Sequence, residues 1–169
     1  MIAFDLDGTL VDSVPDLTWA LAEMSRAVGR AAPELAQVRE WVGDGVRRLV
    51  KRTLTGSRNG EPDTVLFEHG YTLFRDAYRR HLAVATGVYP GVCETLDALR
   101  ARELCLACIT NKAAEFTGPL LEAFGLRARF DIVISGDTLP ERKPSPLPLL
   151  YAANHCRVPP DTALMVGDS

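Results

Sequence analysis

Five polar side chains, widely spaced along the sequence, together have the chemistry needed to transfer a phosphoryl group. Asp5 and Asp7 stand two positions apart near the N-terminus, and Thr110, Lys143 and Asp168 follow at long intervals. Carboxylates can serve as nucleophile, acid, base or ligand of a hard cation, whereas a hydroxyl and an ammonium can bind phosphate oxygens. The set therefore indicates a phosphate site with a hard cation, provided that the fold brings these residues together.

The acidic residues can divide the reaction between them. Asp5 can attack phosphorus and form an aspartyl-phosphate if a cation offsets the repulsion between the two anions. Asp7 can protonate the leaving alkoxide and later activate water against the acyl-phosphate. Mg²⁺ is the expected cation, because it prefers oxygen ligands. We expect the carboxylates of Asp5 and Asp168 and the main-chain carbonyl of Asp7 to bind it.

Other residues are expected to bind the substrate. Thr110, with nearby backbone N–H groups, and Lys143 would bind the non-bridging phosphate oxygens, where negative charge must be neutralised in the transition state. Gly8 lets the chain turn sharply beside the phosphate. Thr9 and Asn111 are further substrate-binding candidates. Each assignment has a plainer alternative: an Asp-Gly pair can be a simple turn, and a loop lysine such as Lys143 can be solvated.

Three neighbouring polar residues are less clearly functional. Lys112 is expected to be a solvated loop residue or an outer contact of the site, and Asp137 a turn or capping residue. Arg47 opens a basic run that is typical of a solvated helix face. It is also a candidate partner for a substrate carboxylate.

The elements that must position these residues follow from the apolar pattern. A buried strand is predicted at residues 2–5, followed by helices only between about 14 and 84. After Tyr89-Pro-Gly91 helices and strands alternate. The predicted helices are 92–102, 113–124 and 146–156, and the predicted strands are 104–110, 132–135 and 163–166.

This alternation predicts an α/β fold, a Rossmann-like parallel sheet covered by helices. The first strand is expected to join that sheet, so the helical segment is an insertion. We expect a catalytic core of residues 1–13 and 88–169 and a helical cap of residues 14–87. Because ligands bind beyond the carboxyl ends of parallel strands, the candidate residues should meet at one sheet edge.

Composition excludes several classes of protein. Apolar residues make up 47% of the 169-residue chain, and 19 basic against 22 acidic residues give a net charge of −3. We therefore expect a compact, soluble domain without nucleic acid as its partner. No run resembles a signal peptide or membrane span, which indicates a cytoplasmic protein. Separately, we expect the protein to be a monomer or a homodimer. The four cysteines are few for a chain of this length, which makes a disulfide scaffold improbable. Cys105 and Cys108 are expected to be buried small hydrophobes.

The segment Asp5-Leu-Asp-Gly-Thr-Leu-Val-Asp-Ser13 resembles the first motif of the haloacid dehalogenase-like phosphatases. Thr110, Lys143 and Gly167-Asp168 are similar to the second, third and fourth motifs, in the same order. Dehalogenase members typically lack the second aspartate, so Asp7 favours a phosphotransferase. The resemblance implies a magnesium-dependent hydrolase of small phosphomonoesters, with the helical insertion as a type 1 cap.

Within that family, further segments resemble the phosphoglycolate phosphatase subfamily, which implies 2-phosphoglycolate as substrate. They are Val11-Asp-Ser-Val-Pro-Asp16, Trp41-Val-Gly-Asp-Gly45, Val88-Tyr-Pro-Gly-Val92, Ile109-Thr-Asn-Lys112 and Gly136-Asp-Thr-Leu-Pro140. Three alternatives stay open: a sugar phosphatase, a phosphomutase, and a catalytically silent phosphate-binding module.

The resemblance also concerns the end of the sequence. In the family the fourth motif continues to another acidic residue that helps to hold Mg²⁺, and further elements follow. The sequence given ends at Ser169. We therefore expect the C-terminal part of the core to be missing from it, with apolar surface exposed beside the last strand.

Overall fold

The computed structural model describes residues 1–168. Ser169, the residue that directly follows the predicted fourth motif Gly167-Asp168, lies outside the described residues. The chain divides into two compact units. One is formed by Met1–Asp12 together with the chain from Gly87 onward, and the other by Ser13–Thr86.

The first unit contains a four-stranded parallel sheet, in which the apolar runs predicted as strands pair with one another. The strand order is β5-β4-β1-β6, with Phe4 paired to Cys108 on one side and to Val166 on the other. The strands are β1 (Ile2–Phe4), β4 (Leu106–Ile109), β5 (Ile132–Ile134) and β6 (Leu164–Val166). Their shared direction places all four carboxyl ends at one edge of the sheet, and the α/β fold predicted from the sequence is confirmed.

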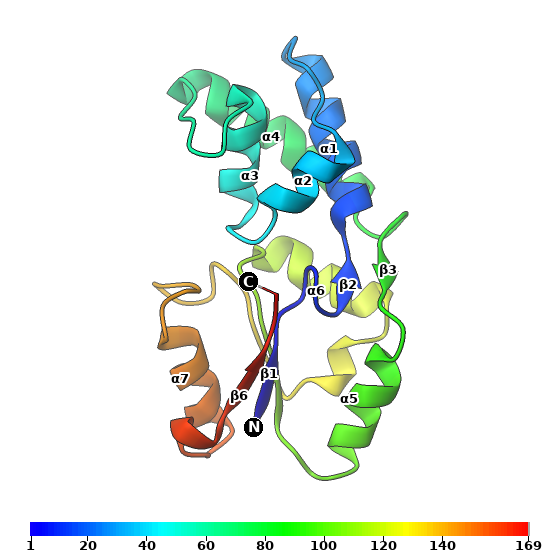
Figure 1. Cartoon of the computed structure of the whole chain (residues 1–169), viewed down its shortest axis with the longest axis vertical. Coiled ribbons are helices and arrows are strands. Elements are labelled where there is room, and N and C mark those ends of the chain that lie inside the picture. The colour runs from blue at the N-terminus through cyan, green and yellow to red at the C-terminus, as the bar shows by residue number, and fades with distance from the viewer. Residues whose placement is uncertain (169) are drawn as a thin grey trace. The chain divides into compact units, whose positions relative to one another are not determined.

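Three helices connect and cover these strands. They are α5 (Val92–Arg100), α6 (Ala114–Ala123) and α7 (Leu147–His155), with 3₁₀ turns at Arg127–Arg129 and Pro160–Thr162. Figure 1 shows α5 and α7 on opposite sides of the sheet. This follows from the strand order, because the chain moves outward from β1 to β5 and then crosses back to β6, and right-handed crossovers require opposite faces for the two directions.

A short antiparallel ribbon was not predicted from the sequence. It pairs β2 (Val11–Asp12) with β3 (Gly87–Val88), with Val11 opposite Val88. The ribbon joins the two points where the chain leaves the first unit and returns to it. Each strand has only two residues, too few for an alternating pattern to show.

The second unit consists of helices only, as the sequence predicted for this stretch. They are α1 (Val14–Ala27), α2 (Leu35–Trp41), α3 (Val46–Thr55) and α4 (Thr64–Arg80). The aromatic stripe of α4 supplies its core, since Phe67, Phe74 and Tyr78 are buried together with Leu21 and Met24 of α1. The 3.6-residue period of both helices explains why these side chains share one buried face.

Two observations concern the surface. Leu164 and Val166 of β6 are exposed by 56% and 37%. This is the apolar exposure expected beside the last strand. In residues 1–168, no helix is long and apolar enough to cross a bilayer.

The expectation for the cysteines was wrong in one respect. Cys105 forms a disulfide with Cys156, whereas Cys108 is a buried free thiol. Cys105 lies just before β4, and Cys156 follows α7, which packs on the sheet. The pair is 51 residues apart in the chain, so local spacing could not indicate it.

Candidate active site

Polar residues follow the strands at the carboxyl edge of the sheet. Asp5 comes directly after β1, and its backbone N–H donates to the carbonyl of Val166 at 2.9 Å. Thr110 comes directly after β4, and its N–H donates to the carbonyl of Ile134 at 3.0 Å. The sheet hydrogen bonding thus continues into the site, which fixes the backbone of both residues.

The Asp5 carboxylate is buried and held at both oxygens. Oδ1 accepts a hydrogen bond from the N–H of Leu6 at 2.7 Å, and Oδ2 lies 2.5 Å from the Nζ of Lys143. Asp5 is only 4% exposed. A carboxylate this deeply buried needs a nearby positive charge, and Lys143 supplies it. The structure therefore brings together the nucleophile and the phosphate-binding lysine expected from the sequence.

Asp7 faces a second lysine. The Nζ of Lys112 lies 3.0 Å from Oδ1 and 3.2 Å from Oδ2 of Asp7, and Lys112 is only 2% exposed. Of the two sequence expectations for Lys112, the solvated loop residue is wrong, and the contact at the site is confirmed. Lys112 lies in a bend after β4, where its N–H donates to the hydroxyl of Thr110 at 3.2 Å, and such a bend leaves no periodic pattern that could have indicated the contact.

The residues expected to bind Mg²⁺ have the right donors for it. Asp168 accepts a hydrogen bond from the hydroxyl of Thr9 at 3.0 Å, and its carboxylate lies so close to Gly8 that a Cβ there would overlap it. Gly8 also has a φ of +81°. The carboxylate of Asp168 thus lies against the loop that carries Asp5 and Asp7.

Two carboxylates and a main-chain carbonyl suit Mg²⁺, which usually keeps several waters. Within residues 1–168, no three His, Cys, Asp or Glu side chains cluster in a way that could hold a metal. The expected set differs from such a cluster because one donor, the carbonyl of Asp7, belongs to the backbone. The chemistry of the donors therefore fits a partly hydrated Mg²⁺.

The loops after β4 and β5 are locked to each other. The Asn111 side-chain amide donates to the carbonyl of Lys143 at 3.2 Å, and the N–H of Gly136 donates to the carbonyl of Lys112 at 2.8 Å. A Cβ on Gly136 would overlap the backbone of Asn111. Asp137 accepts from the N–H of Ala114 at 2.8 Å, which confirms it as a cap of α6. These contacts fix Thr110 and Lys143 in position.

The thiol of Cys108 lies beneath this edge, on β4. Burial raises the pKa of Cys108, and the negative charges of Asp5 and Asp7 raise it further. Because a thiol must ionise to react as a nucleophile, Cys108 is an inert packing residue.

Arg47 belongs to the helical unit, in the first turn of α3. Its guanidinium lies over the rings of Phe67 and Tyr71, with the central carbon 4.7 and 4.8 Å from the ring centroids. It also pairs with Glu68 at 3.1 Å. Both kinds of contact hold the side chain, which is still 52% exposed. Its expected role toward a substrate carboxylate stays a prediction.

Comparison with known families gives a match over the whole chain. The model for "haloacid dehalogenase-like hydrolase" matches residues 1–169. A protein named phosphoglycolate phosphatase from Nitrosococcus oceani is 48% identical over 169 residues, which cover 100% of this chain and 75% of that protein. One of the same name from Thiobacillus denitrificans is 45% identical, with 99% and 74% covered.

Solved structures agree with this match. A structure from Haemophilus somnus, described as a predicted phosphoglycolate phosphatase, has a TM-score of 0.93 at 34% identity and covers 99% of this chain and 76% of its own. The structure of CbbY from Rhodobacter sphaeroides in complex with phosphate has a TM-score of 0.80 at 26% identity, with 99% and 77% covered.

Proposed function

The chain belongs to the haloacid dehalogenase-like hydrolase family and is a phosphomonoester hydrolase, and we propose that it cleaves 2-phosphoglycolate into glycolate and phosphate with Asp5 as nucleophile. One observation carries the assignment of Asp5: its buried carboxylate, at the end of β1, is paired with Lys143 beside the acid–base candidate Asp7. The names of the relatives support the substrate.

The residues at the sheet edge have distinct tasks in this proposal. Asp5 attacks the phosphorus and carries the phosphoryl group. Asp7 gives a proton to the leaving alkoxide and then takes one from the water that hydrolyses the aspartyl-phosphate. Lys143 and Thr110 bind the non-bridging oxygens, where charge must be neutralised in the transition state. Gly8, Thr9 and Asn111 form the loops around the phosphate.

Mg²⁺ completes the proposal. Asp5, Asp168 and the carbonyl of Asp7 would hold it. When bound, Mg²⁺ supplies positive charge that lets a carboxylate approach a phosphate dianion. The thiol of Cys108 takes no part in this chemistry.

The direct test measures inorganic phosphate released from 2-phosphoglycolate by the full chain, with and without Mg²⁺. We expect release that depends on Mg²⁺ and is abolished by Asp5→Asn. Asp137→Asn is the matched control, because an asparagine caps a helix as well as an aspartate does. It should keep the activity.

The other outcomes separate the alternatives. Faster release from hexose phosphates than from 2-phosphoglycolate would indicate a sugar phosphatase. Conversion of one hexose phosphate isomer into another would indicate a phosphomutase. Binding of phosphate and Mg²⁺ without turnover on any phosphomonoester would indicate a silent binding module.

A further inference from the structure

The Cys105–Cys156 disulfide lies at the end of the sheet opposite to the candidate active site. Cys105 precedes β4, whereas Thr110 follows it, and Cys156 is the residue after α7. The two Cα atoms are 5.9 Å apart. Both residues are half-buried against a cluster of buried side chains that includes Ala107, Ile109 and Ala152. The disulfide therefore ties the start of β4 to the end of α7.

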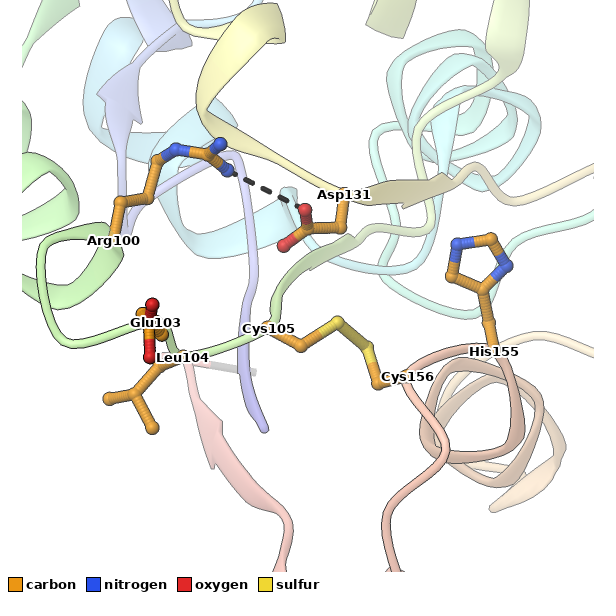
Figure 2. A pocket seen from close by; sticks show the side chains of 7 residues that line it. All are labelled: Arg100, Glu103, Leu104, Cys105, Asp131, His155 and Cys156. Atoms are coloured by element: carbon orange, nitrogen blue, oxygen red, sulfur yellow. Dashed lines mark ion pairs between the residues drawn. A yellow bond between two sulfur atoms is a disulfide. The ribbon is translucent and has the colours of Figure 1, made fainter.

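The disulfide also forms part of the wall of a cavity of about 380 Å³. Figure 2 shows the sulfur–sulfur bond together with the other lining residues, among them Arg100, Glu103, Asp131 and His155. Arg100 pairs with Asp131 at 3.6 Å, and the two side chains are 41% and 40% exposed. The cavity is thus open to solvent and carries charged groups of both signs.

The other two cysteines differ from this pair. Cys108 is fully buried, and burial raises its pKa. Cys93 is a free, half-buried thiol on α5 and is not among the residues that line this cavity. Within the described chain, the disulfide is therefore the sulfur site that a small molecule in the cavity would meet.

We propose that the Cys105–Cys156 disulfide is a thiol-exchange site for small-molecule thiols that enter this cavity. A thiolate attacks one cysteine sulfur and forms a mixed disulfide, and the sulfur–sulfur bond of the protein breaks. The other cysteine leaves as a thiolate and takes a proton from water. A second thiol then releases the first as a small-molecule disulfide. The protein gains two electrons and ends with two thiols.

The lining suits a charged thiol. Arg100 favours an approaching thiolate or carboxylate, because positive charge stabilises both. Glu103 and Asp131 can meet an ammonium. Glutathione, a thiol with two carboxylates and one ammonium group, fits this mixture of charges. Exchange at this end of the sheet leaves Asp5, Asp7 and Lys143 in place, so we expect it to leave phosphate release unchanged.

The test uses the full chain with Cys93→Ser, which removes the half-buried free thiol. The folded protein is incubated with millimolar reduced glutathione and alkylated, and the cysteines are mapped by mass spectrometry. We expect no alkylation of Cys105 or Cys156 before incubation and complete alkylation of both afterwards. Cys108 should react only after denaturation. Oxidised glutathione, added after the reduction and before the alkylation, should re-form the disulfide, so that Cys105 and Cys156 are again not alkylated.

A second variant tests access to the cavity without reduction. With Cys156→Ser in the same background, Cys105 should take up one glutathionyl group from oxidised glutathione while the far-ultraviolet circular dichroism stays native. Two results would overturn the proposal. One is alkylation of Cys105 and Cys156 without any reductant, which would show that no disulfide forms. The other is a disulfide that opens only in urea, which would show that thiols do not reach it in the folded protein.

Discussion

At the scale of single residues, two lysines face two of the three carboxylates of the candidate site. Lys143 faces Asp5 and Lys112 faces Asp7, whereas Asp168 accepts a hydrogen bond from the hydroxyl of Thr9. A phosphate dianion that enters this site adds further negative charge. A divalent cation offsets part of this excess, which gives an electrostatic reason for Mg²⁺ beside the choice of oxygen ligands.

Lys112 is predicted to hold Asp7 in the orientation needed for proton transfer. Lys112→Met keeps most of the side-chain volume but removes the ammonium that contacts both oxygens of Asp7. We expect kcat to fall about 10- to 100-fold, the equivalent of one strong charged hydrogen bond, with little change in KM. Steady-state kinetics on 2-phosphoglycolate measure both. Lys51→Met, on α3 and paired with Glu61, is the control and should leave kcat unchanged.

Substitution of Gly8 is predicted to weaken Mg²⁺ binding. Gly8 and Gly91 have φ angles of +81° and +83°, so alanine is equally strained at both, but only at Gly8 would the new Cβ overlap Asp168. We expect each substitution to destabilise the fold by about 1–2 kcal/mol. Only Gly8→Ala should raise the Mg²⁺ concentration that gives half-maximal activity. An equal effect of Gly91→Ala on that concentration would contradict the placement of Asp168.

The sequence indicates some site residues better than others. Asp5 and Asp7 share one short motif, so their spacing and the resemblance together were enough to select them. The disulfide partner of Cys105 lies 51 residues away, and only the packing of α7 on the sheet brings it near. Contacts of this kind depend on the assembled fold and leave no mark in local spacing.

At the scale of elements, a buried carboxylate joins the two ends of the helical insertion. Asp16, in the first turn of α1, accepts hydrogen bonds from the backbone N–H groups of Val84, Ala85 and Thr86 at 2.8–3.1 Å. It also accepts from the Thr86 hydroxyl at 2.6 Å, and the Nδ1 of His81 lies 2.8 Å away. Asp16 thus fixes the returning chain against the start of α1.

Asp16→Asn is predicted to weaken this junction strongly. An amide nitrogen would face these donors, which leaves some of the part-buried N–H groups of Val84 and Ala85 and the buried groups of Thr86 without an acceptor. We expect a loss of about 2–4 kcal/mol in the free energy of unfolding, measured by urea denaturation. Asp76→Asn, on the exposed side of α4, removes only the surface pair with Arg79. It should change the stability by less than about 0.5 kcal/mol.

The same carboxylate makes stability depend on pH. Burial alone would raise the pKa of Asp16, but the hydrogen bonds from Thr86, Ala85 and His81 outweigh it and lower the pKa below the usual value of 3.8. Because the pKa of the Asp16 carboxyl is lower in the folded than in the unfolded protein, this carboxylate stabilises the fold at pH values above its unfolded pKa. The stabilisation is lost as the pH falls through the folded pKa. Urea denaturation from pH 6 down to about pH 3 should show this loss in the wild type. A pH dependence of equal size in Asp16→Asn would contradict it.

Elements with a long repeat were predictable, and short ones were not. The helices α1 and α4 were expected because apolar residues recur at helical spacing over several turns, whereas α2 and α3 were expected from the breaks at Pro33 and Gly43–Gly45. The expected strand at 104–110 is shorter in the structure, Leu106–Ile109, since Cys105 and Thr110 lie in the connecting loops. The ribbon of β2 and β3 depends on pairing between residues far apart in the chain, which no local pattern contains.

At the scale of the whole molecule, the disulfide is predicted to contribute to stability as well as to exchange. It closes a loop of 51 residues, for which loop entropy gives about 4 kcal/mol. Urea denaturation with and without a reductant measures this contribution. The double variant Cys105→Ser and Cys156→Ser should match the reduced wild type and should not respond to reductant. A reductant effect that persists in the double variant would assign it to another part of the molecule.

The central claim is that Asp5 carries the phosphoryl group and Asp7 moves the protons. The most direct measurement uses Asp7→Asn with p-nitrophenyl phosphate and Mg²⁺, because this leaving group needs no proton, whereas hydrolysis of the intermediate needs the base. We expect a burst of one p-nitrophenolate per chain, followed by a stall, with the phosphoryl group located on Asp5 by mass spectrometry. A phosphoryl group on another residue, or steady turnover without a burst, would contradict the claim.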